Sequence, residues 1–169
     1  MAIRNPADLK ALLGPGRRLL GLDLGTKTIG LALSDPGLMV ASPIGTIRRT
    51  KFGADAGELA KIIREREAGA VILGLPLALD GAESPATQRV REFARLLLTR
   101  ADLFGTEPEI AFWDERFSTS VVERFMIEAD MTRKRRAEVV DKMAAAYILQ
   151  GALDAIGHGR RADPAFPHG

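Results

Sequence analysis

The pattern of apolar and polar positions differs before and after residue 50. The pattern before residue 50 predicts β-strands. Between residues 19 and 49, three apolar segments are separated by short turn signals: "LLGLDLGT", "TIGLALSD" and "LMVASPIGTIRR". Short apolar runs bounded by glycine, aspartate and proline are typical of β-strands. Because the links are too short for a crossover, the three strands are predicted to form an antiparallel meander. Pro43 predicts an edge position or a bulge for the third strand.

Beyond residue 50, helical periodicity alternates with continuous apolar runs. Leu59, Ile62 and Ile63 share one face of a predicted helix, and Ser84 with Pro85 begins another. The runs "AVILGLPL" and "EIAFWDE" are typical of strands buried on both faces. Strands linked by helices are parallel, with right-handed crossovers. We therefore predict an α/β fold: a mixed five-stranded sheet, three antiparallel strands then two parallel ones, with helices on both faces.

Two further helices are predicted in the last third of the chain. "VVERFMIEA" follows a capping-box pattern at Ser120 and Glu123. The second helix covers "VVDKMAAAYILQGALDAI", and Gly157 is predicted to close it. Asp141 heads an inward stripe of this helix, because Ala145 and Ile148 follow on the same face. The alternative for Asp141 is a capping or ion-paired acid.

Composition limits the class of protein. The chain has 169 residues, 46% of them hydrophobic, which suits one globular domain. We expect an N-terminal extension over residues 1–18, the main domain over 19–157 and a flexible tail over 158–169. No apolar segment is long enough to cross a bilayer, and the first residues lack the order of a signal peptide. The absence of cysteine excludes disulfides and thiolate metal sites, so a cytoplasmic location is expected.

Acidic residues occur where ligands of such a fold collect. Asp23 interrupts the first apolar strand, and a buried carboxylate is costly unless something pairs with it. Asp114 and Glu115 end the strand "EIAFWDE", and the carboxyl ends of parallel strands form the usual ligand site. The structural alternatives are a pairing of Asp23 with Lys27 or its turn, and a surface pair between the two acids and Arg116.

Clustered carboxylates suggest a hard cation. They repel one another and raise one another's pKa, and Mg²⁺ or Mn²⁺ resolves this by taking oxygen ligands. Two such ions ~4 Å apart activate water and stabilise the leaving oxygen of a phosphodiester. The chemistry that fits is therefore metal-dependent cleavage of nucleic acid. The formal net charge of +2 indicates no nucleic acid by itself, so local basic clusters matter more.

Basic and hydroxyl residues near these acids are candidates for substrate contact. Thr26 and Lys27 either bond a phosphate or only close the turn between two strands. The basic segment before Asp141 either contacts a phosphate backbone or forms a solvated loop, and its position favours substrate contact. The candidates in that segment are Arg133, Lys134 and Arg135.

Four stretches together resemble the YqgF (RuvX-like) family of pre-16S rRNA nucleases and Holliday-junction-resolvase homologues. They are "GLDLGTKTIGLALSD", "VILGLPLALDG", "DERFSTS" and "VVDKMAAAYILQGALD", in the family's order, and the likeness covers Leu20 to Ile156. The resemblance implies a ribonuclease H-like fold, in agreement with the element order above. Thr28 departs from the family, in which arginine is common at this position.

The resemblance also implies roles for individual residues. Asp23, Glu115 and Asp141 are implied as metal-binding catalytic acids, with Asp114 as the alternative to Glu115. The residues implied for phosphate contact or for the shape of the loop are Arg116, Ser118 and Thr119.

The leading hypothesis is a cytoplasmic nuclease, dependent on Mg²⁺ or Mn²⁺, that matures the 5′ end of 16S rRNA as a monomer or homodimer. A resolvase of four-way DNA junctions is the alternative within the same class. An actin-like phosphate-binding ATPase or sugar kinase is a further alternative, although such proteins need two domains of this kind. The last alternative is a non-catalytic RNA-binding or transcription factor, which predicts RNA binding indifferent to metal and to loss of Glu115.

Overall fold

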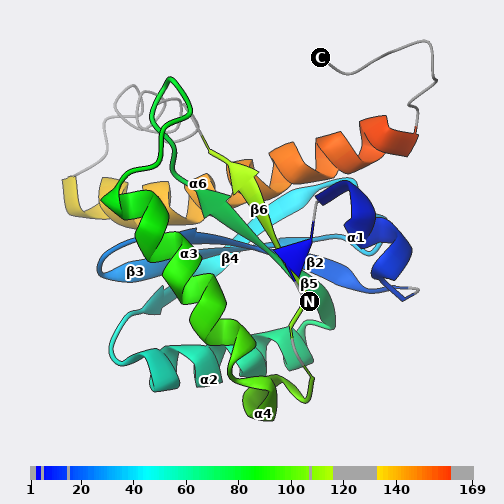
Figure 1. Ribbon diagram of the computed structural model, residues 1–169, viewed down its shortest axis with the longest axis horizontal. Helices are drawn as coiled ribbons and strands as arrows, with labels where there is room; N and C mark the ends of the chain where they lie inside the picture. Colours follow the sequence, from blue (N-terminus) through cyan, green and yellow to red (C-terminus); the bar gives the residue numbers. More distant parts are fainter. Residues whose placement is uncertain (1–2, 5, 15, 107, 116–132, 161–169) are drawn as a thin grey trace.

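The computed structural model describes the backbone of residues 3–4, 6–14, 16–106, 108–115 and 133–160, and leaves the side chains of 3–4, 7, 133–142 and 158–160 outside the description. Its centre is a six-stranded sheet of order β1-β6-β5-β2-β3-β4 (Figure 1). The strands are β1 (Ile3–Arg4), β2 (Arg18–Leu24), β3 (Thr28–Ser34), β4 (Ala41–Arg48), β5 (Ala68–Leu75) and β6 (Ile110–Asp114). The helices are α1 (Pro6–Leu12), α2 (Phe52–Glu65), α3 (Pro85–Leu98), α4 (Ala101–Phe104) and α6 (Arg133–Arg160).

The predicted pairing of the five main strands is confirmed. β2, β3 and β4 are antiparallel neighbours, and β2, β5 and β6 are parallel. The two-residue strand β1 is added at the edge beside β6 and was too short for the sequence pattern to reveal. β4 is the other edge strand, and its pairing with β3 shifts where Leu31 faces Gly45 but Ala32 faces Pro43. Pro43 therefore lies on an edge strand and beside a bulge, as predicted.

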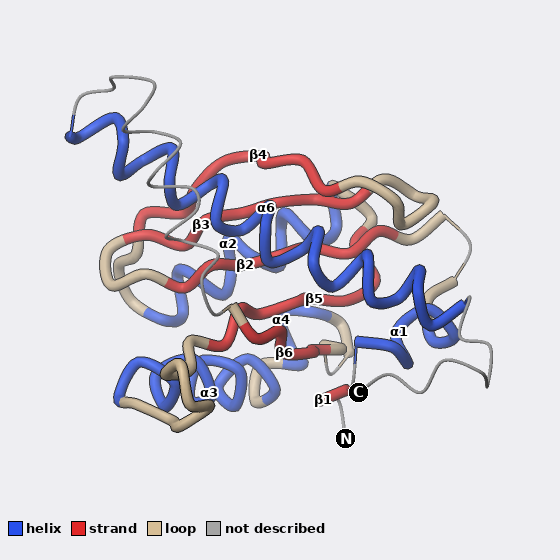
Figure 2. Tube along the Cα trace, turned by 90° about the horizontal axis from the view of Figure 1, so that it is seen from above, coloured by secondary structure: helices blue, strands red, loops and turns tan. Residues whose placement is uncertain are grey.

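Helices cover both faces of the sheet, as Figure 2 shows from above. Successive residues of a strand point to opposite faces, so each buried strand contributes to two cores. Leu20, Leu22 and Leu73 belong to the core under α2 and α3, which also contains Leu59 and Phe93. The second core lies under α6 and collects the alternate positions of the same strands. Its members on the strands include Leu19, Ala32, Ala70, Ile72 and Ala111.

Helix α6 is longer than the sequence pattern predicts. It begins at Arg133, so the basic segment forms its first turns and is not a loop. Arg, Lys and Glu favour helix, and this extends the element toward its N-terminus. At the other end α6 continues through Gly157 to Arg160, so the prediction that Gly157 closes the helix is wrong. A glycine ends a helix when its backbone turns left-handed, and Gly157 keeps the helical conformation.

Some predictions remain without a test. The predicted helix "VVERFMIEA" with its cap at Ser120 lies outside the described residues. The division into 1–18, 19–157 and 158–169 also stays a prediction. Within the described ranges, no helix is long and apolar enough to cross a membrane.

Candidate metal centre at the carboxyl edge of the sheet

Strand alternation determines which acids face each other. Ile72 on β5 and Ala111 on β6 point toward α6, as Leu19 does on β2. Residues an even number of positions apart on a strand face the same side of the sheet. Gly74 lies two residues after Ile72, and Glu115 and Asp23 lie four residues after Ala111 and Leu19, so all three face α6 as well. Asp114 faces the other side of the sheet, as do Ile110 and Phe112, which lie under α3. Glu115, and not Asp114, therefore lies on the same face of the sheet as Asp23, and its role as a metal ligand stays a prediction.

Asp23 and Glu115 are in direct contact across β5. Their side chains are hydrogen-bonded to each other. A Cβ atom added to Gly74 would lie 2.7 Å from Oε2 of Glu115, so this side chain passes over the space that the glycine leaves open. That Oε2 atom is buried and accepts no hydrogen bond from the described residues. The site therefore holds a carboxylate oxygen that is withdrawn from water and still needs a positive partner.

The electrostatics of the pair show the same need. The pKa of Glu115 is raised from its ordinary value of 4.5 to about 7, first by burial and then by the charge of Asp23 and the hydrogen bond between the two side chains. The charge of Asp114 adds a smaller effect. Near neutral pH, the Glu115 carboxyl is therefore only partly ionised. A divalent cation would fit between the two acids because it attracts both carboxylates and satisfies the unpartnered oxygen.

The third predicted acid is placed by its backbone alone. Asp141 lies in α6 one turn before Ala145, and the carbonyl oxygen of Ala145 lies 3.1 Å from a Cβ added to Gly21. The N-terminal half of α6 extends toward the edge where β2, β5 and β6 end (Figure 1). This backbone position agrees with the predicted role of Asp141, which stays a prediction. No group of three metal-ligating side chains occurs among the side chains that the structure describes.

The turn after β2 is held by an arginine that the sequence reasoning missed. The backbone N–H of Arg49 donates to the carbonyl oxygen of Lys27 at 2.8 Å, and its guanidinium donates to that of Gly25 at 2.5 Å. The same guanidinium lies 5.8 Å from the ring centre of Phe93. Thr26 and Lys27 are exposed on this turn, beside the carboxylate pair. No local signal singles out Arg49, because its partner Gly25 is 24 residues away.

The remaining predicted substrate contacts are not placed. Three of them lie outside the described residues: Arg116, Ser118 and Thr119. Three others begin α6, and nothing is described of their side chains: Arg133, Lys134 and Arg135.

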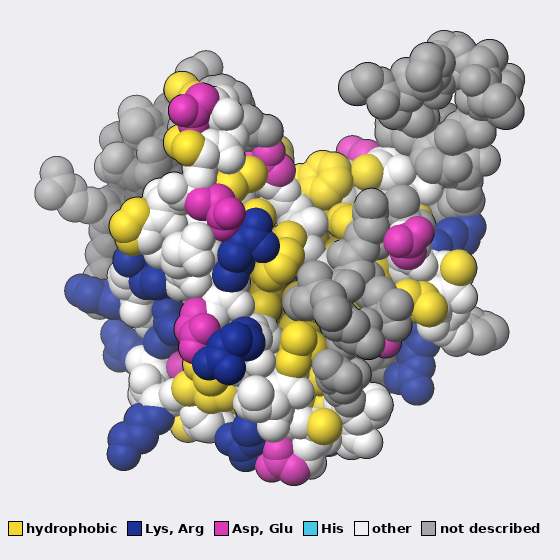
Figure 3. Space-filling model, viewed as in Figure 1, with side chains coloured by type: hydrophobic (Ala, Val, Ile, Leu, Met, Phe, Trp, Pro, Cys, Tyr) yellow, Lys and Arg dark blue, Asp and Glu magenta, His cyan; other side chains and the backbone are white. Residues whose placement is uncertain are grey.

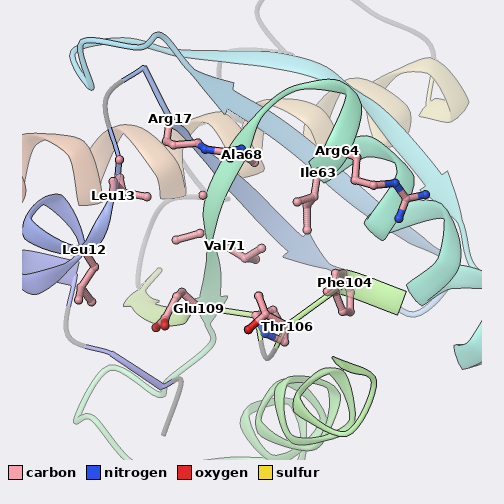
Figure 4. A pocket seen from close by; sticks show the side chains of 14 residues that line it. Leu12, Leu13, Arg17, Ile63, Arg64, Ala68, Val71, Phe104, Thr106 and Glu109 are labelled. Carbon is pink, nitrogen blue, oxygen red and sulfur yellow. The ribbon is translucent and has the colours of Figure 1, made fainter. Parts of the chain in front are cut away.

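A pocket of about 450 Å³ lies elsewhere, at the amino-terminal end of β5. Figure 4 shows Leu12, Ile63, Phe104 and Arg64 around it. The carboxylate pair lies at the other end of this strand, beyond Gly74. The cavity and the candidate metal centre are therefore separate features of the molecule.

The order of the sheet and the helices on both faces define a ribonuclease H-like fold, with the acids of β2 and β6 on either side of β5. The structure of T. thermophilus RuvC in complex with a Holliday junction substrate has this fold and matches with a TM-score of 0.51 at 13% identity, over 82% of this chain and 94% of that one. The chain belongs to the RuvX family, whose model is described as Holliday junction resolvase and matches residues 17–155. The resemblance found in the sequence is thereby confirmed.

Close relatives carry one shared name. A protein of Rhodospirillum centenum is 69% identical over 159 residues, which cover 94% of this chain and 85% of that protein. A protein of Paramagnetospirillum magneticum is 56% identical over 154 residues, with 91% and 96% covered. Both are named "Putative pre-16S rRNA nuclease".

Proposed function

We propose that this protein is a divalent-metal-dependent nuclease that cuts precursor 16S rRNA at its 5′ end. The observation that carries the proposal is the contact between Asp23 and Glu115, with a buried carboxylate oxygen that lacks a partner among the described residues. A half-buried pair of acids in contact destabilises a fold, and such pairs are typical of functional sites. The name of the close relatives supports the choice of substrate.

The proposed roles follow from position. Asp23 and Glu115 would hold Mg²⁺ or Mn²⁺ together with Asp141, whose backbone lies on the facing helix. A cation bound there supplies an activated water and stabilises the leaving oxygen. Thr26 and Lys27, exposed on the turn beside Asp23, would hold the phosphate next to the scissile bond. For the same purpose we propose Arg116, Ser118, Thr119, Arg133, Lys134 and Arg135.

The test compares two substitutions of acids, one on the face of the sheet under α6 and one on the opposite face. Asp23→Asn is expected to lower Mn²⁺-supported cleavage by more than about a hundredfold, because even residues that only support a metal ligand contribute ~10- to 100-fold. Asp114→Asn, on the opposite face, is expected to keep cleavage near the unaltered rate. Circular dichroism checks that both variants fold. Unchanged cleavage by Asp23→Asn would refute the proposal.

A resolvase of DNA junctions is the second candidate, favoured by the description of the family model. Rates on a precursor rRNA end and on a four-way DNA junction, measured side by side, separate the two. Resolution requires paired cuts, so a strictly monomeric protein would exclude this candidate and leave the rRNA nuclease. For the rRNA nuclease we propose a cytoplasmic location and nucleic acid as the partner. RNA binding without cleavage, unaffected by Glu115→Gln, would indicate a non-catalytic factor instead.

A further inference from the structure

Exposed basic residues of this molecule differ in whether carboxylates neutralise them. On α2, α3 and the segment before α4, four basic side chains form ion pairs with N–O distances of 2.5 to 3.9 Å, whereas the exposed Arg64 and Arg89 occur in none of these pairs. These pairs are Lys61–Glu65, Arg91–Glu83, Arg95–Glu92 and Arg100–Asp102. Lys27, Arg48 and Lys51 are exposed as well, and no ion pair of the described part of the chain includes any of them. These three cations are therefore available to a charged partner.

The three residues belong to one surface, which we call the basic edge surface (Lys27, Arg48 and Lys51). Arg48 is the ladder partner of Thr28, the residue after Lys27. The N–H of Arg49 donates a hydrogen bond of 2.8 Å to the carbonyl oxygen of Lys27. This bond joins the turn between β2 and β3 to the segment between β4 and α2. Figure 3 shows Lys and Arg side chains gathered on the side of the molecule where Figure 1 places the β2–β3 turn and the segment between β4 and α2.

An acid does occur near this surface, and its oxygen is already engaged. Asp55, in the first turn of α2, is buried, and its Oδ1 accepts the backbone N–H of Thr50 at 3.0 Å. The hydroxyl of Thr50 lies 3.4 Å from the same oxygen. Asp55 thus fixes the segment that carries Lys51 while its own charge stays inside. The segment is held in shape, and its cations point outward.

The surface lies close to the carboxylate pair. Asp23 pairs with Gly30, which pairs with Thr46, two residues before Arg48. Two strand spacings of about 4.8 Å and two residues of about 3.4 Å place the Cα atom of Arg48 roughly 12 Å from that of Asp23. A few nucleotides of one strand span such a distance. Cations on a rigid frame beside an acidic metal site balance its negative charge for an incoming polyanion.

We propose that the basic edge surface binds the phosphate backbone of the nucleic-acid strand that enters the carboxylate site, with Arg48 and Lys51 as contacts away from the cut. This inference rests on the proposed function, and it adds two residues that the motifs do not single out. Each contact releases about 0.7 to 0.9 counterions, depending on whether the bound nucleic acid is single- or double-stranded. The surface would therefore contribute affinity and salt dependence, and leave the cutting chemistry to the acids.

The experiment measures binding apart from cleavage. Fluorescence anisotropy of a labelled single-stranded RNA gives the Kd of the full chain in EDTA, over a range of KCl concentrations. Arg48→Ala with Lys51→Ala is expected to reduce the slope of log Kd against log salt by about 1.4, because each contact with a single strand contributes about 0.7. The rise in Kd between 50 and 200 mM salt then becomes roughly sevenfold smaller than for the unaltered protein.

The control variant removes an equal number of positive charges, but at the other end of the sheet. Lys10→Ala with Arg66→Ala alters two exposed cations on α1 and after α2, and its salt slope is expected to stay unchanged. Equal slopes for the two double variants would overturn the inference, even if Asp23→Asn abolishes cleavage. A reduced slope with cleavage retained in Asp23→Asn would instead uphold this surface and refute the proposed metal site. RNA binding too weak to measure in the unaltered protein would overturn this inference.

Discussion

Gly74 offers the sharpest test of how the candidate site is built. A Cβ atom at this position would lie 2.4 Å from Cδ1 of Ile148 on α6 and 2.7 Å from Oε2 of Glu115. Carbon atoms in contact are normally 3.5 to 4.0 Å apart, so Gly74→Ala forces neighbouring groups to move by about 1 Å. One of these groups belongs to the core and the other to the candidate metal centre. The substitution therefore has two separable effects.

The first effect is on stability. Overpacking of this size costs about 1–3 kcal/mol of the free energy of unfolding, because Ile148 is fully buried and cannot swing into solvent. The second effect is on the site, since Glu115 is displaced from its position beside Asp23. A displacement near 1 Å lowers a rate by about a hundredfold. We expect Gly74→Ala to show both losses.

A second substitution separates the two losses. Ile148→Val removes the Cδ1 atom, so in the double variant with Gly74→Ala the packing clash becomes smaller while the clash with Glu115 stays. Urea denaturation is expected to show partial recovery of stability, and Mn²⁺-supported cleavage of the precursor rRNA to show none. Gly57→Ala is the matched control, because a Cβ there meets no atom within 4 Å and alanine favours helix by up to about 1 kcal/mol. Unaltered stability and cleavage in Gly74→Ala would refute the described position of Glu115.

Two further predictions concern Glu115 and Arg49. In EDTA, the raised pKa of Glu115 makes its contribution to stability complete below pH 4.5 and lost as the pH rises to about 7. Urea denaturation should show this loss, on the order of 3 kcal/mol, relative to Glu115→Gln, and parallel pH profiles would contradict it. Arg49→Ala should raise the KM for RNA roughly ten- to a hundredfold with a smaller change in kcat, because a lost charged hydrogen bond costs about 1.5–3 kcal/mol. Steady-state kinetics would contradict this if Arg49→Ala leaves KM unchanged; Arg49→Lys should not restore it, since an ammonium lacks the fork of donors.

The part of the fold that local pattern controls was predictable. The turns at Gly25 and Asp35, the apolar runs and the helical periodicity are all properties of a few neighbouring residues. They were sufficient for the five main strands, their relative directions and the edge position of Pro43. Asp23 was predicted as a site residue because a single acid inside an apolar strand conflicts with that strand's own pattern. Local patterns failed at both ends of α6: residues of high helix propensity extended it toward the N-terminus, and at the C-terminus it continued through Gly157 to Arg160.

The site itself depended on distances that no local pattern contains. The sequence by itself determined that one acid lies near the end of β2 and that two acids lie at the end of β6 and directly after it. Only the tertiary structure decided that Glu115, and not Asp114, meets Asp23 across Gly74. The physical reason is that strand alternation gives two sets of side chains, but the helices packed on each face decide which set is turned toward α6. The brace from Arg49 to Gly25 likewise exists because β4 pairs with β3, so that the end of β4 lies beside the turn between β2 and β3.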